Sequence, residues 1–155
     1  MQSRLIFLNT ESMSISVQTM ISIGRKLFEE VDIPTESEII SEDAITKTIE
    51  RESSWTAEVK GISPFPSGKG SGSGTSLIYD NGISISNWGG TFTTYDGEQI
   101  TFKGRDMNKN NKFIVLRTYF TNSPELPWMN GLICLLDGYF DSEDKSFKCN
   151  GYELM

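Results

Sequence analysis

Short apolar runs, separated by turn residues about every ten positions, recur through most of this chain. Such spacing is typical of antiparallel β-sandwiches and barrels, and helical periodicity is nearly absent. The clearest unit spans 92–102, where Asp96-Gly97 suits a two-residue turn and predicts a β-hairpin. In that hairpin Tyr95, Ile100 and Phe102 should share one face of the sheet.

A second hairpin precedes this one, with its turn at Asn81-Gly82. Beyond that turn the apolar positions change parity, from Ile83 and Ile85 to Trp88 and Phe92, and Gly89-Gly90 lies between Trp88 and Phe92. A bulge or sharp bend is therefore expected in this strand. Barrels use such bends to curl their strands into a closed wall.

Three further strands are predicted at 113–120, 132–140 and 146–153. The first is apolar on both faces except at 117–118, as expected for a central strand. Strands that follow one another in the chain are usually neighbours in space, so this half should form a meander. We therefore predict a single all-β domain over 1–155, folded as a closed, mostly antiparallel β-barrel of about eight strands.

The first third of the chain leaves several alternatives open. The segment 29–43 carries seven carboxylates and Pro34, which suits extra strands, a mobile acidic segment or a lid. The segment 41–52 is the best candidate for a short helix, but its β-branched residues favour a strand equally. Residues 13–17 alternate between apolar and polar side chains, as a strand would. The glycine, serine and lysine of 67–74 give that segment the composition of a flexible linker.

Composition places the chain among proteins that fold on their own. Of its 155 residues, 37% are hydrophobic and 23% are charged, which is ordinary for one globular domain. With 21 Asp and Glu against 14 Lys and Arg, the formal net charge is −7, which disfavours binding to nucleic acid. The lack of basic clusters argues against a membrane surface, and no apolar run reaches the ~20 residues of a spanning helix. The apolar run at 5–8 is too short for a signal peptide, so a cytoplasmic location is expected.

The chain contains no histidine, and this absence removes several kinds of chemistry. Ser-His-Asp and Cys-His triads, histidine general bases and histidine-ligated metals are all excluded. Cys134 and Cys149 should lie too far apart on neighbouring strands for a disulfide, so we expect two reduced thiols in the core. Two thiols without a histidine cannot form a zinc site of the usual kind, and the acidic run at 29–43 lacks the Asp-x-Asp-x-Asp-Gly spacing of an EF-hand calcium site. We expect no catalytic residue set of a familiar kind, no metal and no cofactor.

Two charged residues interrupt the apolar strands of the second half. Arg117 and Asp137 belong to consecutive strands, and one hypothesis is that they face each other inside the barrel. They would then hold a polar group of a ligand, with Asp137 as an acid or base whose pKa is raised by burial. The alternatives are a structural ion pair or two separate charges facing water. The aromatic residues suited to lining the same cavity, or simply to filling the core, are Trp55, Trp88, Tyr119 and Tyr139.

Several short motifs resemble those of a known group of proteins. They are Gly68-Lys69-Gly70-Ser71-Gly72, Asp96-Gly97 between two strands, Ser123-Pro124-Glu125-Leu126 and Asn130-Gly131. Over 55–154 the chain looks like an uncharacterised prokaryotic family whose members resemble the allene oxide cyclase and dirigent type of β-barrel, a lipocalin-like or calycin-like shape. In that family the Gly-x-Gly-x-Gly run lies within a strand. The resemblance therefore implies that 68–72 belongs to the barrel wall and not to a linker.

Three functions are compatible with such a barrel. The first is binding of a small hydrophobic ligand, with a few polar residues that orient it. The second is that of a cofactor-free isomerase or cyclase of the allene oxide cyclase type, which the resemblance implies and which would act by confining a reactive substrate. The third is a filled barrel with a structural or oligomeric role, for which a homodimer is the commonest assembly. We rank ligand binding first because no residue set in the sequence requires chemistry.

Overall fold

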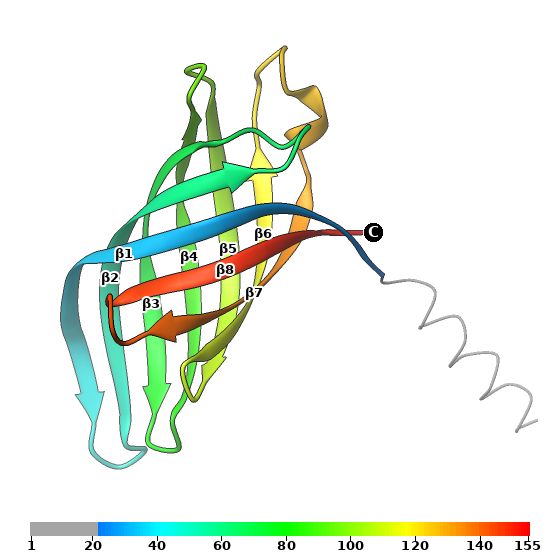
Figure 1. Ribbon diagram of the computed structural model, residues 1–155. Helices are drawn as coiled ribbons and strands as arrows, with labels where there is room; N and C mark the ends of the chain where they lie inside the picture. Colours follow the sequence, from blue (N-terminus) through cyan, green and yellow to red (C-terminus); the bar gives the residue numbers. More distant parts are fainter. Residues whose placement is uncertain (1–21) are drawn as a thin grey trace, which may run out of the picture.

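Eight antiparallel strands form a closed barrel in the computed structural model, which describes residues 22–155 (Figure 1). Each strand pairs with the next along the chain, and β8 pairs with β1 to complete the wall. The predicted meander barrel is therefore confirmed. The strands are β1 (Ile23–Asp43), β2 (Thr48–Gly61), β3 (Gly68–Tyr79), β4 (Ile83–Thr94), β5 (Gln99–Lys109), β6 (Lys112–Phe120), β7 (Ile133–Asp141) and β8 (Ser146–Leu154).

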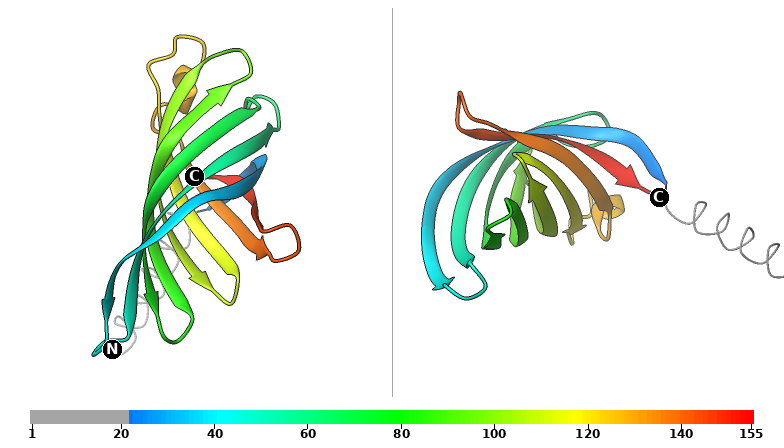
Figure 2. Two further views of the ribbon diagram at one scale, coloured as in Figure 1. Left: turned by 90° about the vertical axis from the view of Figure 1, so that its left-hand side faces the viewer. Right: turned by 90° about the horizontal axis from the view of Figure 1, so that it is seen from below.

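The two ends of the barrel carry different connections. The β1–β2, β3–β4 and β5–β6 turns lie together at one end, and the β2–β3, β4–β5 and β6–β7 connections lie at the other (Figures 1 and 2). The β6–β7 connection contains a short 3-10 helix, η1 (Pro127–Met129). Over residues 22–155, no helix has the length and apolar character that crossing a membrane requires.

Alternate side chains along each strand point into the barrel. On β6, Phe113, Val115, Arg117 and Tyr119 are all buried, while the residues between them face outward and are mostly exposed. This alternation follows from the pleat of a strand, whose successive side chains point to opposite faces. The interior is therefore built from one face of each strand.

The interior is densely filled at the η1 end. Phe65, from the β2–β3 connection, is only 3% exposed, and its ring centroid lies 4.7 Å from that of Phe28 and 5.7 Å from that of Tyr119. Met129 of η1 is fully buried in the same core cluster. These side chains close this end of the barrel.

The glycine-rich segment is strand β3, part of the barrel wall, as the family resemblance implied. Its composition pointed instead to a linker, and that interpretation is wrong. The glycines of β3 face inward, and at Gly68, Gly72 and Gly74 the neighbouring atoms leave no room for a Cβ atom. A Cβ at Gly72 would lie 2.5 Å from Cζ2 of Trp55, and one at Gly74 would collide with the Asn87 carbonyl oxygen and lie 2.7 Å from Cε3 of Trp88. Glycine at these positions therefore allows the neighbouring backbone and both indoles to approach β3 closely.

The acidic segment 29–43 belongs to β1, and 41–52 forms the end of β1, a turn and the start of β2. Neither a helix nor a lid is therefore present in this segment, and the alternative of extra strands is confirmed. The physical reason is that β1 pairs with β2 over most of its length, from Phe28↔Gly61 to Asp43↔Thr48. Residues 13–17, where alternation also predicts a strand, lie outside the described residues.

The hairpin at 92–102 is present, but its turn differs from the prediction. The loop has three residues, because the Thr94 N–H donates to the Glu98 carbonyl and Gly97 adopts a φ of +93°. Ile100 therefore pairs with Phe92, whereas a two-residue turn at Asp96-Gly97 would have paired it with Thr93. A register slip of one residue reverses the face of a side chain relative to the opposite strand. Tyr95 accordingly lies outside the barrel, 66% exposed, and does not share a face with Ile100.

Candidate functional site

A buried ion pair lies in the middle of the barrel interior. Arg117 of β6 donates from Nη1 and Nη2 to the two carboxylate oxygens of Glu30 on β1, at 2.7 and 2.8 Å. Only 7% of the Arg117 side chain and 2% of the Glu30 side chain are exposed. The guanidinium also donates to the Tyr119 hydroxyl at 3.3 Å and lies 4.7 Å from the ring centroid of Phe102. Both partners are therefore held in one geometry.

Burial and pairing act in opposite directions on the pKa values of this pair. Burial alone would raise the pKa of Glu30, but the Arg117 charge and its hydrogen bonds outweigh burial and leave that pKa below its usual value. Burial would lower the pKa of Arg117, and Glu30 reverses that effect, so the pKa is raised. The two groups are consequently ionised together, and the pair carries no net charge.

A cavity lies beside this pair, toward the end of the barrel opposite η1. Its volume is about 60 Å³, and Arg117 forms part of its lining. Phe113 and Phe147, which also line it, are the second residues of β6 and β8, next to the β5–β6 and β7–β8 turns. The other lining side chains are mainly apolar or aromatic, and they include Trp55, Trp88, Phe102, Val115 and Leu136. The indole of Trp55 stacks on Phe102 with ring centroids 5.7 Å apart.

Two carboxyl groups, from Asp32 of β1 and Asp106 of β5, also line the cavity. In each group the Oδ1 atom is buried and no hydrogen-bond donor of the described protein reaches it. Burial raises the pKa of Asp32 well above its usual value, and the nearby charge of Glu30 raises it further. Burial also raises the pKa of Asp106, against hydrogen bonds that involve Ser86 and the Trp88 side chain. The cavity therefore presents two carboxyl oxygens whose hydrogen-bonding capacity is unused.

The structure brings four of the six predicted site residues to the interior. Trp55, Trp88 and Arg117 line the cavity, and Tyr119 contacts Arg117 from the η1 side.

Asp137 and Tyr139 lie outside the barrel, so the hypothesis that Asp137 faces Arg117 is wrong. Arg117 pairs across β6–β7 with Cys134. Asp137 is three positions further along β7, and an odd offset places its side chain on the opposite face. The partner of Arg117 is Glu30, which sequence analysis missed together with Asp32 and Asp106. For Glu30 and Asp32, the available sequence signal was their alternate spacing with Phe28, which places the three side chains on one face of a strand. This pattern was hard to recognise because further acidic residues surround it.

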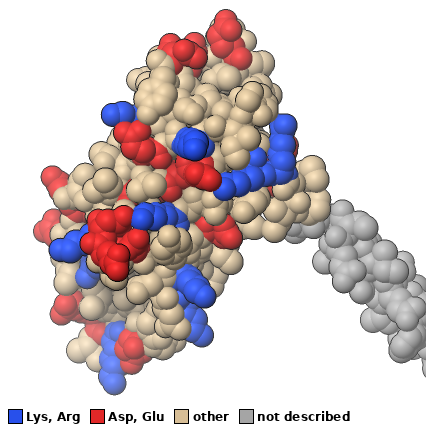
Figure 3. Space-filling model, in the orientation of Figure 1, with Lys and Arg blue, Asp and Glu red and all other residues tan. Residues whose placement is uncertain are grey.

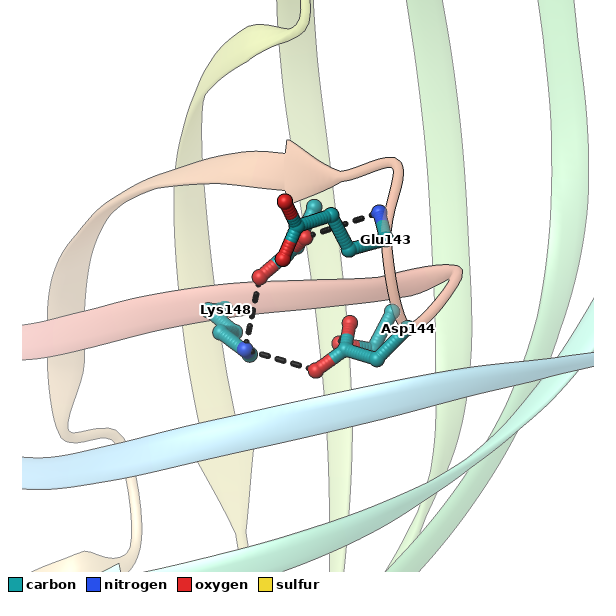
Figure 4. Close-up of polar contacts among 5 residues, drawn as sticks. Glu143, Asp144 and Lys148 are labelled. Atoms are coloured by element: carbon teal, nitrogen blue, oxygen red, sulfur yellow. Dashed lines mark hydrogen bonds and ion pairs between the residues drawn. The ribbon is translucent and has the colours of Figure 1, made fainter.

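Asp137 and Tyr139 instead border a larger hollow of about 970 Å³ on the outer surface. Its other walls come mainly from outward-facing residues of β1, β5, β6 and β8, such as Met107 and Ile114, which are 61% and 56% exposed. The buried residues Glu30, Phe113 and Cys149 also border it. Lys148, at its rim, pairs with Asp141 at the end of β7 and with Asp144 of the β7–β8 turn, at Nζ–Oδ distances of 2.8 and 2.7 Å; Figure 4 labels Lys148 and Asp144. This hollow contains no buried polar group without a partner among the described residues, so we take the interior cavity as the candidate site.

Residues 22–155 contain no cluster of three His, Cys, Asp or Glu that could hold a metal ion. Cys134 and Cys149 are free and buried, as predicted from the sequence. Burial raises the pKa of Cys134 to about 12, which keeps its thiol protonated at neutral pH.

Fold and cavity together place the chain among small β-barrels with an aromatic interior. No protein-family model and no curated protein sequence matches it. Among solved structures, a β-barrel-like protein from Acinetobacter baumannii AYE is 16% identical, with a TM-score of 0.73 over 87% of this chain and 96% of its own. A protein of unknown function from Clostridium acetobutylicum ATCC 824 is 16% identical, with a TM-score of 0.67 over 84% and 98%. An enzyme from Penicillium herquei is 15% identical, with a TM-score of 0.62 over 86% and 95%. At these identities the likeness is one of fold alone.

Proposed function

We propose that this protein binds a small, mainly apolar ligand, or one end of a longer one, in the cavity beside Arg117. The observation that carries this proposal is an aromatic cavity that also contains two buried carboxyl oxygens without partners. A few polar groups within an apolar pocket are typical of small-molecule sites. Because the volume is about 60 Å³, comparable to that of roughly two water molecules in the liquid, the bound part of the ligand must be small.

Native mass spectrometry of protein purified from its own host tests this proposal, since gentle desolvation keeps a non-covalent ligand attached. We expect a reproducible added mass. The three tryptophans then give an internal control in NMR spectra, because Trp55 and Trp88 line the cavity while Trp128 packs against Phe65 at the other end. Ligand removal should shift the indole signals of Trp55 and Trp88 and leave that of Trp128 in place. Bare protein and unchanged indole signals with added candidate ligands would contradict ligand binding.

A second candidate function is that of a cofactor-free isomerase or cyclase of the allene oxide cyclase type. Two observations favour it: the buried Asp32 carboxyl beside the cavity, and the fold shared with the Penicillium herquei enzyme. A protonated carboxyl in a confined site is suited to donating a proton to a reacting group. If this function is correct, cargo released from the protein and incubated with it should give a product of unchanged mass but different chromatographic retention. Asp32→Asn should then bind the cargo without converting it.

A filled barrel with a structural role is the remaining alternative, and the cavity argues against it. We also expect no nucleic-acid or membrane partner, a cytoplasmic location and, as an alternative assembly, a homodimer. The face of the molecule in Figure 3 supports the first expectation, because Lys and Arg are scattered there among Asp and Glu and form no continuous basic patch. Size-exclusion chromatography with light scattering would determine the oligomeric state.

A further inference from the structure

The charges around the cavity favour one class of ligand. Arg117 is the only basic residue in its lining, and both of its Nη atoms donate to Glu30. Glu30 cancels the charge of Arg117, so an anionic ligand would find no uncompensated positive charge. The Oδ1 atoms of Asp32 and Asp106, in contrast, are buried acceptors that no group of the described protein satisfies. A buried acceptor without a donor is unfavourable, and a ligand that brings a donor removes this penalty.

The aromatic walls of the cavity also favour a positively charged ligand over an anion. The aromatic side chains of Trp55, Trp88, Phe113 and Phe147 line the cavity together with the two carboxyl groups. The face of an aromatic ring carries partial negative charge and attracts an ammonium group, most strongly when water is excluded. We propose that the cavity selects a small organic cation, namely a protonated amine on an apolar body, over neutral and anionic molecules of the same shape. This inference rests on the proposed ligand-binding function and specifies its ligand.

Binding of such a cation displaces a proton from the cavity. The ionisable groups that line the cavity or adjoin Asp32 are Glu30, Arg117 of β6, Cys149 of β8 and Asp106 of β5. Because the pKa of Asp32 is raised, its carboxyl is protonated over a wider pH range, and an arriving ammonium favours the ionised form. The carboxyl proton is released to solvent when the cation binds. Affinity for an amine therefore rises with pH through the Asp32 pKa and levels off until the amine itself loses its proton.

Three matched probes test the inference: isobutylamine, isobutanol and isobutyrate, which have similar apolar bodies but carry a positive, zero and negative charge. Each is titrated into the full-length protein, and the dissociation constant is read from amide and tryptophan indole shifts in NMR spectra. We expect isobutylamine to bind at least tenfold more tightly than isobutanol, and isobutyrate to bind most weakly. Repeating the isobutylamine titration at several pH values should show affinity increasing with pH.

Two variants locate the interaction. Asp32→Asn keeps the shape of the neutral carboxyl, so it should fold, and it should weaken isobutylamine binding about tenfold or more because one charge-assisted hydrogen bond is lost. Asp137→Asn makes the same substitution on the exposed outer face and should leave the affinity unchanged.

Two outcomes would overturn the inference while leaving ligand binding intact. One is that isobutanol or isobutyrate binds as tightly as isobutylamine. The other is that both variants weaken isobutylamine binding equally, because the attraction would then come from the overall negative charge of the protein and not from Asp32. If no probe shifts the indole signals and the protein from its host is also bare, the inference and the proposed function both fail.

Discussion

Replacing Arg117 with methionine should leave Glu30 as an unpaired charge inside the barrel. Methionine replaces the aliphatic part of the arginine side chain but not the guanidinium, whose Cζ lies 4.7 Å from the Phe102 ring centroid, so the substitution removes the ion pair and this cation–π contact together. Removing one partner of a buried pair typically costs about 3–5 kcal/mol. For a chain of this size, that loss corresponds to a decrease in melting temperature of roughly 6–20 °C. It is also a large fraction of the ~5–15 kcal/mol that stabilises a typical domain.

The double variant Glu30→Leu/Arg117→Met should recover most of this loss, because replacing both partners of a buried pair with apolar residues is often neutral or stabilising. Urea denaturation followed by circular dichroism measures the free energy of unfolding of each protein, and equal m-values would validate the comparison. Arg105→Met is the matched control, since Arg105 is exposed on the outer face of neighbouring strand β5 and should change stability by less than about 0.5 kcal/mol. A loss of under about 1 kcal/mol in Arg117→Met, or a double variant as unstable as the single one, would refute the reasoning.

Three further variants or measurements examine other parts of the barrel. Gly72→Ala should displace Trp55 and lower the free energy of unfolding by about 1–3 kcal/mol. Gly70→Ala should be tolerated, because a Cβ at this position makes only ordinary contacts at 3.5 Å. Chemical denaturation of the two variants measures the difference. The pKa of Asp32 is higher in the folded protein than in the unfolded chain. The wild-type protein therefore loses stability as the pH rises from the unfolded-state pKa of Asp32 to its folded-state pKa, because the unfolded chain gives up this proton first. Asp32→Asn should therefore melt at a higher temperature than wild type at neutral pH, and the difference should vanish in acid. Cys134 should react with a thiol reagent only as fast as the protein unfolds, because burial raises its pKa to about 12; rapid labelling of the native protein would contradict this.

The class of fold could be predicted from sequence because its signals are local. Period-two alternation and turn residues are properties of a few neighbouring positions, and they indicated the strands of the second half and the meander order. Sequence composition misled at 67–74, where only the family resemblance indicated a strand. At Gly72 and Gly74 the absence of a side chain makes room for Trp55 and Trp88, which approach from the neighbouring strands β2 and β4.

The candidate site was predicted only in part, because local patterns do not determine which face of a strand points inward. Arg117, Tyr119, Trp55 and Trp88 stood out as residue types suited to an interior, and the structure places them there. Asp137 stood out for the same reason, yet the register of β6 against β7 turns it outward.

Sequence alone thus determined that this protein is an acidic, histidine-free β-barrel with aromatic side chains available for a cavity. Only the tertiary structure decided that Arg117 pairs with Glu30, a residue 87 positions away in the chain. Their contact depends on the pairing of β1 with β8, which joins the two ends of the strand order and closes the barrel wall. Ring closure is a property of all eight strands together, so no local pattern of residues could specify which charges would meet inside.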